Sequence, residues 1–216
     1  MLILKNVHKS FDSVSVLNGI NLHLERGVVY TLRGDNGSGK TTLFNIISGF
    51  LRPTSGTICL KGKEIGNTSP YQINRLGIGR TFQDLRLATQ MTVRENILAA
   101  MENGLFAFPS KTQKERVDKV LEQVALDGKA DELAGEISYG QQKLLTLGCC
   151  IANNADLLLI DEPVAGIDKT NFFKIINVVM EMKKSGKTVF QIEHHPDYVR
   201  DTSDTVVIME RGRIVC

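Results

Sequence analysis

Residues 34–42 constrain this chain more than any other stretch of its sequence. They run Gly-Asp-Asn-Gly-Ser-Gly-Lys-Thr-Thr and match the pattern G-x-x-x-x-G-K-[ST] at every fixed position. The apolar, mostly β-branched residues 28–32 predict a strand before them, and residues 43–47 predict a helix that stops near Gly49. A strand, a glycine loop and a helix in this order are the context in which the pattern binds phosphate, so an accidental glycine-rich turn is disfavoured.

Each kind of residue in this loop suits a triphosphate. Glycines let backbone N–H groups turn inward, because no Cβ blocks the φ angles that such a turn requires. The helix that begins at the loop directs the positive end of its dipole at the anion. Lys40 adds a full charge, which we expect to be a surface charge on the loop, and the Thr41 hydroxyl is a suitable hard oxygen for Mg²⁺. The loop therefore predicts ATP with Mg²⁺, held by Asn36, Gly37, Ser38, Gly39, Lys40, Thr41 and Thr42.

Composition narrows the kind of partner. The chain has 216 residues, enough for one large domain or for a domain with a lobe inserted in it. Lys and Arg total 26 against 24 for Asp and Glu, so the net charge of +2 gives no large basic field and we expect no nucleic-acid partner. The four cysteines form no C-x-x-C pair, which suits a reducing cytosol. The first residues do not form a signal peptide and no apolar run approaches the roughly 18 residues of a membrane span, so we expect any membrane role to come through a partner.

Hydrophobic periodicity predicts an α/β fold. We expect strands at 2–6 and 20–24, joined by a loop that carries Phe11, and an edge hairpin at 57–60. The apolar runs at 157–160 and 188–192 fit parallel strands that are covered on both faces. A terminal hairpin is expected from the apolar segments 206–209 and 214–215 around a polar turn.

Helical patterns interrupt these strands between about residues 84 and 151. Residues 92–95 (Thr-Val-Arg-Glu) and 112–115 (Thr-Gln-Lys-Glu) both match the capping box [ST]-x-x-[DE] at a helix start. Residues 138–142 (Ser-Tyr-Gly-Gln-Gln) open a further helix with an apolar face, in which Cys149 and Cys150 are expected to be buried thiols. We interpret this stretch as a helical lobe inserted into the α/β core.

Two carboxylates follow the apolar strand 157–160. Ligands of parallel sheets bind at the carboxyl ends of the strands, so Asp161 and Glu162 are expected at the same edge as the phosphate loop. There Asp161 can hold Mg²⁺, and Glu162 can orient and deprotonate a water molecule aimed at the γ-phosphate. A solvated acidic loop is the alternative, and the complete phosphate loop disfavours it.

Spacing alone does not decide the roles of three further polar residues. Gln83 can ligate Mg²⁺ or position water, but a surface glutamine is the ordinary interpretation. His194 and His195 follow another buried strand, and one imidazole there can contact a γ-phosphate oxygen. Neighbouring residues of an extended strand point to opposite faces, so the two histidines cannot both face one site, and spacing does not choose between them.

Together these residues resemble the nucleotide-binding subunits of ATP-binding-cassette (ABC) transporters, over residues 3–215. The specific motifs are 138–142 (Ser-Tyr-Gly-Gln-Gln), similar to the signature S-G-G-Q, and Asp-Glu-Pro at 161–163 followed by Ala-Gly-Ile-Asp at 165–168, similar to the D-loop. The resemblance implies a P-loop NTPase core, with a RecA-like mixed sheet and an antiparallel β subdomain, at residues 1–83 and 152–216. It also implies an inserted α-helical subdomain at about 84–151 that carries the signature.

The resemblance also implies roles for single residues. Phe11 matches the aromatic residue that stacks on adenine, and Gln83 matches the glutamine that couples Mg²⁺ to the helical subdomain. Glu162 matches the catalytic base and His194 the switch histidine, whereas His195 takes no family role. The signature residues Ser138, Gly140 and Gln141 match those that cap the γ-phosphate held by a second copy, head to tail.

One branch of the family is resembled more than the others. Tyr139 stands where most members have glycine, and tyrosine is frequent there in the branched-chain amino acid importers. The segments 79–87 and 91–96 also resemble that branch. Two departures remain: residues 145–148 lack the arginine usual after the signature, and Asp168-Lys169 replaces the usual Asn-Pro.

The resemblance therefore implies an ATPase subunit that dimerises on ATP, as a homodimer or with a second ABC ATPase subunit. It would power integral membrane subunits, through a groove near Gln83, from the cytoplasmic face of the membrane. One alternative is a non-transport member of the superfamily that acts as a nucleotide-dependent switch, which the single cassette and the short helical segment without heptads disfavour. Another is a regulator that no longer hydrolyses ATP, against which the intact Lys40, Asp161, Glu162 and His194 argue.

Overall fold

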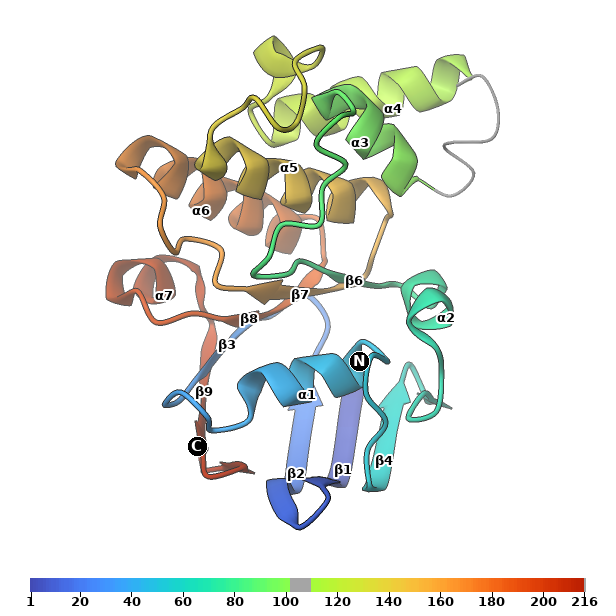
Figure 1. The fold of residues 1–216 in the computed structure, drawn as a ribbon, viewed down its shortest axis with the longest axis vertical. Helices are drawn as coiled ribbons and strands as arrows, with labels where there is room; N and C mark the ends of the chain where they lie inside the picture. Colours follow the sequence, from blue (N-terminus) through green and yellow to red (C-terminus); the bar gives the residue numbers. More distant parts are fainter. Residues whose placement is uncertain (102–109, 216) are drawn as a thin grey trace.

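The computed structural model describes residues 1–101 and 110–215, which form two sheets and the helices around them (Figure 1). The strands are β1 (Leu2–Phe11), β2 (Val14–Leu24), β3 (Val29–Arg33), β4 (Ser55–Leu60), β5 (Lys63–Glu64), β6 (Ile78–Arg80), β7 (Leu157–Asp161), β8 (Thr188–Ile192), β9 (Thr205–Glu210) and β10 (Arg213–Ile214). The helices are α1 (Lys40–Ile47), α2 (Pro70–Arg75), α3 (Val93–Ala100), α4 (Lys111–Gln123), the 3₁₀ turn η1 (Asp127–Lys129), α5 (Tyr139–Ala152), α6 (Lys169–Lys184) and α7 (Pro196–Thr202).

The two sheets differ in strand direction. One has the order β2-β1-β4-β5 and is antiparallel. The other has the order β10-β9-β3-β8-β7-β6 and is parallel except for β10, which pairs antiparallel with β9. The predicted α/β class, with a mixed sheet and an antiparallel sheet beside it, is confirmed.

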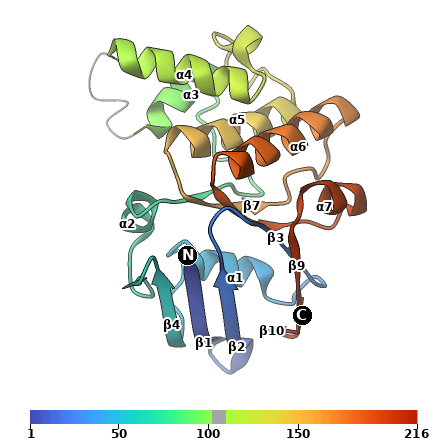
Figure 2. The same ribbon diagram turned by 180° about the vertical axis from the view of Figure 1, so that it is seen from behind.

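The six-stranded sheet separates two hydrophobic cores, as the pattern of its buried strands predicts. Along β7, Leu157 and Leu159 pack in the core that contains α1 and the antiparallel sheet. Leu158 and Ile160 pack in the opposite core, with residues of α3, α4, α5 and α6. Figures 1 and 2 show these helices on one side of the sheet and α1 on the other. Because successive side chains of a strand point to opposite faces, an apolar run of this kind suits a strand covered on both sides.

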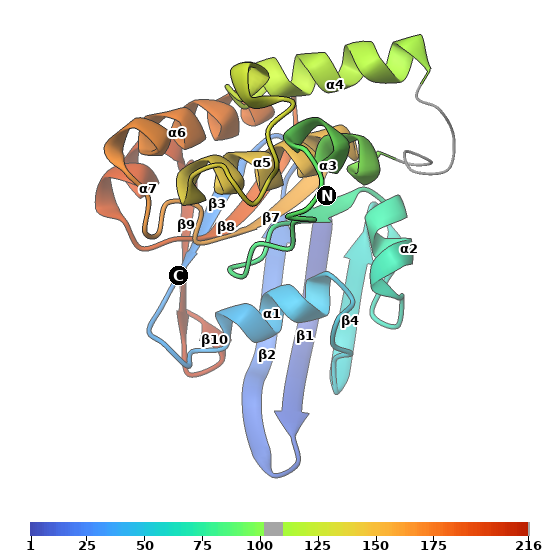
Figure 3. The same ribbon diagram turned by 45° about the horizontal axis from the view of Figure 1, so that its top comes forward.

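Helices α3 and α4 pack on α5 in a layer above the sheet (Figure 3). The capping box at the start of α3 is confirmed: the Thr92 hydroxyl accepts from the Glu95 N–H at 3.1 Å, and Glu95 accepts from the Thr92 N–H at 2.8 Å. The box expected at 112–115 is wrong. Helix α4 begins two residues earlier, where Ser110 and Gln113 form the reciprocal pair. A glutamine serves in this motif as well as a glutamate, so both windows fit the local rule.

Other boundaries also differ from the expectation. Strands β1 and β2 extend well beyond 2–6 and 20–24, and Phe11 is the last residue of β1, paired with Val14, and does not lie in a loop. The outer half of this hairpin is polar and solvated, so backbone pairing continues where the hydrophobic pattern has stopped. The short helices α2 and α7, both with proline in their first turn, were not expected. None of the helices in the described part of the chain has the length and apolar character of a membrane span.

Candidate functional site

The loop between β3 and α1 has the backbone that a phosphate loop requires. Gly34, Gly37 and Gly39 have φ values of 154°, 81° and 107°, in the range that side chains with a Cβ rarely adopt. A Cβ on Gly34 would lie 2.1 Å from the Met209 carbonyl oxygen, and a Cβ on Gly39 would lie 2.9 Å from Leu17 Cδ2. The loop is thus pressed against β9 and β2, and glycine is required on packing grounds as well as conformational ones.

Lys40 is buried, with 8% of its surface exposed, so the expectation of a surface charge on the loop is wrong. It is the first residue of α1, and its Nζ folds back to donate to the carbonyl oxygens of Gly34 at 2.6 Å and Asp35 at 2.9 Å. Burial lowers the pKa of Lys40, and the charges of Glu162, Asp35 and Asp161 oppose that shift. The ammonium group and the two carboxylates after β7 are therefore close enough to interact.

The unsatisfied groups of this loop fit an anion. The Ser38 hydroxyl is buried, and in the described residues it has no hydrogen-bond partner. Gly39, the N-cap of α1, brings no side-chain acceptor, and no acidic residue stands in the first turn. Free N–H groups at a helix start and an orphaned hydroxyl next to a buried ammonium group are the chemistry that a phosphate satisfies.

The two carboxylates at the end of β7, Asp161 and Glu162, lie in different surroundings. Asp161 is 9% exposed; its N–H donates to the Thr81 hydroxyl at 3.2 Å, and its Oδ2 lies 3.9 Å from Arg80 Nη2. Burial raises the pKa of Asp161, while the charges of Arg80, Lys40 and Lys143 act in the opposite direction. Glu162 is half-buried, and its Oε2 accepts from Gln83 Nε2 at 3.3 Å. The structure thus brings Gln83 to Glu162, which spacing alone did not indicate.

The two histidines after β8 have different neighbours. The His195 ring packs on Phe172 of α6, with 4.8 Å between ring centroids. His194 is exposed, and its backbone N–H donates to Glu193 Oε1 at 2.7 Å. Both histidines are exposed at the carboxyl edge of β8, and they differ in that the His195 ring packs on Phe172.

Helix α5 begins with Ser138 as its N-cap. The Ser138 hydroxyl accepts from the Gln141 N–H at 3.3 Å, and the Gln141 side chain accepts from the Ser138 N–H at 2.9 Å. A Cβ on Gly140 would lie 2.6 Å from Asn171 Nδ2, so this glycine lets α5 approach α6. Tyr139 is exposed, and its ring centroid lies 5.3 Å from Lys143 Nζ. Ser138 is therefore a helix cap, and its hydroxyl proton is still available for donation.

Comparison with known proteins identifies the family of this chain. Residues 17–165 match the ABC transporter family. The chain belongs to the ABC transporter family. The probable branched-chain amino acid transport ATP-binding protein LivG of Archaeoglobus fulgidus is 38% identical, over 98% of this chain and 86% of that protein. The high-affinity branched-chain amino acid transport ATP-binding protein BraF of Pseudomonas aeruginosa is 35% identical, over 94% and 85%.

Solved structures agree with this family. The ADP conformation of an ATP-binding cassette of an ABC transporter superposes with a TM-score of 0.90 at 34% identity, over 100% of this chain and 89% of that one. The chain is thus an ABC transporter ATP-binding subunit, a cassette with ATPase chemistry.

Phe11 of this ABC cassette offers one open aromatic face. It ends β1 with 41% of its surface exposed, and Lys9 Nζ lies 4.8 Å from its ring centroid. The ring brings no hydrogen-bond donor or acceptor of its own, so it can stack on a base without reading the polar edge of that base.

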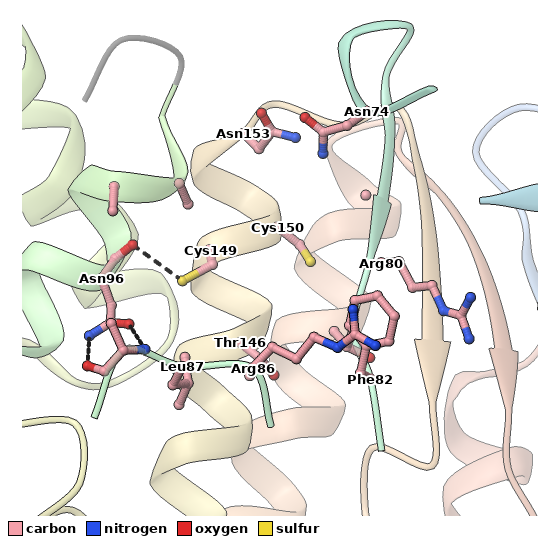
Figure 4. Close-up of a pocket in the computed structure, with 15 residues that line it drawn as sticks. Asn74, Arg80, Phe82, Arg86, Leu87, Asn96, Thr146, Cys149, Cys150 and Asn153 are labelled. Carbon is pink, nitrogen blue, oxygen red and sulfur yellow. Dashed lines mark hydrogen bonds between the residues drawn. The ribbon is translucent and has the colours of Figure 1, made fainter. Parts of the chain in front are cut away.

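A groove of about 460 Å³ opens between the segment after β6 and helices α3 and α5 (Figure 4). Figure 4 shows Arg86 lying across the Phe82 ring, and its guanidinium carbon is 3.7 Å from the ring centroid. Burial raises the pKa of Cys149 and Cys150 to about 12, so both thiols in the groove wall are poor nucleophiles. The lining side chains include Asn74, Arg80, Phe82, Arg86, Leu87, Asn96, Thr146, Cys149, Cys150 and Asn153.

Sequence reasoning missed three charged residues that surround the ABC site. Arg80 pairs with Asp161, Lys143 Nζ donates to the Glu162 carbonyl oxygen at 2.5 Å, and Glu193 accepts from backbone N–H groups next to the site. One signal was available: Lys143 lies on the apolar face of its helix, between residues that are fully buried. The partners themselves are far apart in sequence, and no local pattern indicates them.

Proposed function

We propose that this cassette binds ATP with Mg²⁺, closes on a second ATP-binding subunit, and thereby powers branched-chain amino acid transport by integral membrane subunits. The observation that carries the proposal is the contact between Gln83 and Glu162, beside the phosphate loop. It joins the segment that borders the groove to the carboxylate proposed as the base. The branched-chain amino acid relatives, aligned over nearly the whole chain, supply the substrate class.

The phosphate loop is the proposed ATP site. Its backbone N–H groups at 36–42 and the Ser38 hydroxyl would hold the phosphates, and Lys40 would exchange its carbonyl partners for phosphate oxygens. Phe11 would stack on the base. Hard oxygens suit Mg²⁺, and Thr41, Gln83 and Asp161 offer a hydroxyl, an amide carbonyl and a carboxylate. A bound Mg²⁺ would neutralise phosphate charge, and buried Asp161 is a carboxylate whose charge such a cation stabilises.

Glu162 is the proposed general base. Its carboxylate is half-buried and accepts a hydrogen bond from Gln83, so it is oriented while it still reaches solvent. It would accept a proton at one carboxylate oxygen from the water that attacks the γ-phosphate. His194, exposed at the end of β8, is proposed to contact a γ-phosphate oxygen.

The start of α5 is the proposed contact with a second copy. The Ser138 Oγ acts as an acceptor inside the chain, so its proton can be donated to an anion outside it. The exposed helix start adds a favourable dipole, half-buried Gln141 lies beside Ser138, and buried Gly140 lets this helix start lie against α6. In this arrangement the helical subdomain, proposed as residues 84–151, caps a γ-phosphate held by the α/β core, residues 1–83 and 152–216, of the other subunit.

The groove of Figure 4 is the proposed seat of the membrane subunits. Its lining combines apolar and aromatic side chains, such as Phe82 and Leu87, with polar and basic ones, such as Arg86, and a short amphipathic helix from a membrane subunit fits that chemistry. The segment that borders the groove leads directly to Gln83, so a movement of the docked helix reaches the catalytic side. The cassette would then work on the cytoplasmic face of the membrane.

A groove variant tests this proposal. Ala99→Trp places a bulky ring in the groove wall, whereas Lys119→Trp adds the same ring on the exposed face of α4 as a matched control. Both variants are expected to bind a fluorescent ATP analogue normally. Only Ala99→Trp should fail to co-purify with the membrane subunits of the transporter and fail to support leucine-stimulated ATP hydrolysis in vesicles. Normal assembly and stimulation with Ala99→Trp would contradict the docking site.

A further inference from the structure

Glu162 has an unusual backbone conformation. Its φ is +47°, in the left-handed region that only a few per cent of residues other than glycine occupy. Backbone hydrogen bonds hold this residue: its N–H donates to the Ile192 carbonyl oxygen at 3.0 Å, and its carbonyl oxygen accepts from Lys143 Nζ at 2.5 Å and from the Ala165 N–H at 3.4 Å. The backbone of Glu162 is thus held in part by partners on β8 and α5, while its carboxylate accepts from Gln83.

Lys143 is a buried ammonium group, with 5% of its surface exposed, on the helix that begins at the signature. Burial lowers the pKa of Lys143, and Glu193 is the foremost of the carboxylates that oppose this shift. A charged amine is costly to bury, so an apolar side chain of similar length would satisfy simple packing better. The specific contribution of the lysine is its hydrogen bond to the backbone of Glu162.

Glu193 supplies a negative charge that interacts with the Lys143 ammonium group. It is 4% exposed, and it accepts three backbone N–H groups: Val164 at 3.2 Å on one oxygen, and His194 at 2.7 Å and His195 at 3.1 Å on the other. One carboxylate therefore joins the segment after β7 to the segment after β8. Both segments carry a residue proposed to act on the γ-phosphate.

We propose that Lys143 and Glu193 are positioning residues for the ATPase reaction, which together hold the backbone around Glu162 so that its carboxylate is aimed at the attacking water. The inference rests on the proposed role of Glu162 as the base. Lys143 lies on the helix whose first residue, Ser138, is proposed to meet the partner's nucleotide. Contact between Ser138 and the partner's nucleotide would therefore act through α5 on the Glu162 carboxylate of the subunit that contains this Ser138.

Lys143→Met tests the lysine, because it keeps the length and removes the charge. The expected result is a kcat lower by about 10- to 100-fold, the loss that corresponds to one hydrogen bond from a charged donor. KM for ATP and the affinity for a fluorescent ATP analogue should stay within about twofold of the unsubstituted protein, because the phosphate loop is untouched. Lys119→Met, on the exposed face of α4, is the matched control and should change neither quantity.

Measurements in a Glu162→Gln background distinguish a positioning role of Lys143 from a general disturbance of the structure. In Glu162→Gln, single-turnover hydrolysis should fall by less than a further twofold when Lys143→Met is added, because Lys143 acts through Glu162. Glu193→Gln alone should also lower kcat without changing KM, and should be non-additive with Lys143→Met. Losses that multiply in the Glu162→Gln background, or a KM that rises with the loss of kcat, would overturn the inference.

The outcomes also distinguish this inference from the proposed function. If Glu162→Gln hydrolyses ATP at the unsubstituted rate, the assignment of the base fails, and the inference fails with it. If Glu162→Gln is inactive while Lys143→Met and Glu193→Gln are fully active, only the positioning role fails and the base assignment stands.

Discussion

Arg80 and Asp161 form an ion pair that the folded chain shields almost completely from water. Arg80 Nη2 lies 3.9 Å from Asp161 Oδ2, and the two side chains are 6% and 9% exposed. Arg80 Nη1 also donates to Asn45 Oδ1 at 2.8 Å and to the Ser48 hydroxyl at 2.7 Å, both on or next to α1. Burial lowers the pKa of Arg80 to about 10, so the guanidinium stays charged at neutral pH. One side chain thus touches the groove wall, the phosphate-loop helix and the carboxylate proposed for Mg²⁺.

The first prediction follows from that pair. Arg80→Met leaves the Asp161 carboxylate buried without its guanidinium partner, and we expect the free energy of unfolding to fall by about 3 kcal/mol. Arg80→Met with Asp161→Asn removes both charges and should recover more than half of that loss. Urea unfolding at neutral pH measures both variants. A double variant as unstable as the single one would show that Arg80 stabilises the fold through its other contacts.

The second prediction concerns Lys40→Ala. We expect ATP affinity to fall by about 100-fold, because a charged hydrogen bond contributes about 1.5–3 kcal/mol and each 1.4 kcal/mol is a factor of ten. The fold should persist, because the substitution removes two hydrogen bonds, from Nζ to the carbonyl oxygens of Gly34 and Asp35, but also removes the cost of burying the ammonium group. Titration of a fluorescent ATP analogue, with Lys119→Ala as the control, measures the effect. Unchanged affinity would mean that this loop is not the nucleotide site.

The third prediction is loose recognition of the base. Phe11 presents a stacking face without a hydrogen-bond donor, and stacking contributes only roughly 1 kcal/mol. GTP should therefore be hydrolysed at a rate within about tenfold of ATP, and Phe11→Ala should weaken both nucleotides by a similar factor. Steady-state kinetics with the two nucleotides test this. A strong preference for ATP would reveal polar contacts to adenine elsewhere in the site.

The fourth prediction is an ATP-bound dimer. Glu162→Gln removes proton acceptance but keeps the size and one carbonyl oxygen for Gln83, so hydrolysis should slow by about 10²–10⁴-fold. ATP binding should survive, because the phosphate loop is unchanged. The closed state should then accumulate, and the variant should elute as a dimer with ATP and as a monomer without nucleotide on size exclusion.

Ser138→Arg provides the control for that dimer. Its bulky cation blocks the proposed contact with the partner's nucleotide, so adding it to Glu162→Gln should restore the monomer in the presence of ATP. Hydrolysis by Glu162→Gln at the unsubstituted rate would mean that another residue is the base. An inactive variant that binds ATP and stays monomeric would contradict the shared site for the isolated subunit.

Local patterns predicted the fold well where burial and backbone pairing coincide. Strand β8 matched its predicted range, and the phosphate loop lay where its strand and helix required. The patterns failed where pairing continues without burial, as in the solvated half of the β1 hairpin that ends at Phe11. They also failed where two windows satisfy the same rule, as at the start of α4, which is capped by Ser110.

The candidate site also contains residues that the sequence could predict and contacts that it could not. Residues in recurrent motifs, such as Lys40 and Glu162, could be proposed from the sequence, because the chemistry of a triphosphate suits those types at that spacing, and their roles stay predictions. Their surroundings could not be named. The burial of Lys40 and the bond from Lys143 to Glu162 depend on how α1 and α5 dock, which is decided by tertiary packing.

The start of α5 determines which signature positions can change without harm to the subunit itself. Ser138 and Gln141 satisfy each other's N–H groups, and the absence of a Cβ on Gly140 makes room for Asn171. These three residues therefore contribute to the stability of the subunit itself, whether or not a partner is present. Tyr139 is exposed, with Lys143 Nζ 5.3 Å from its ring centroid, and it is the one position where this chain differs from S-G-G-Q. The difference from S-G-G-Q thus falls on an exposed side chain at the start of the helix proposed to meet a second subunit.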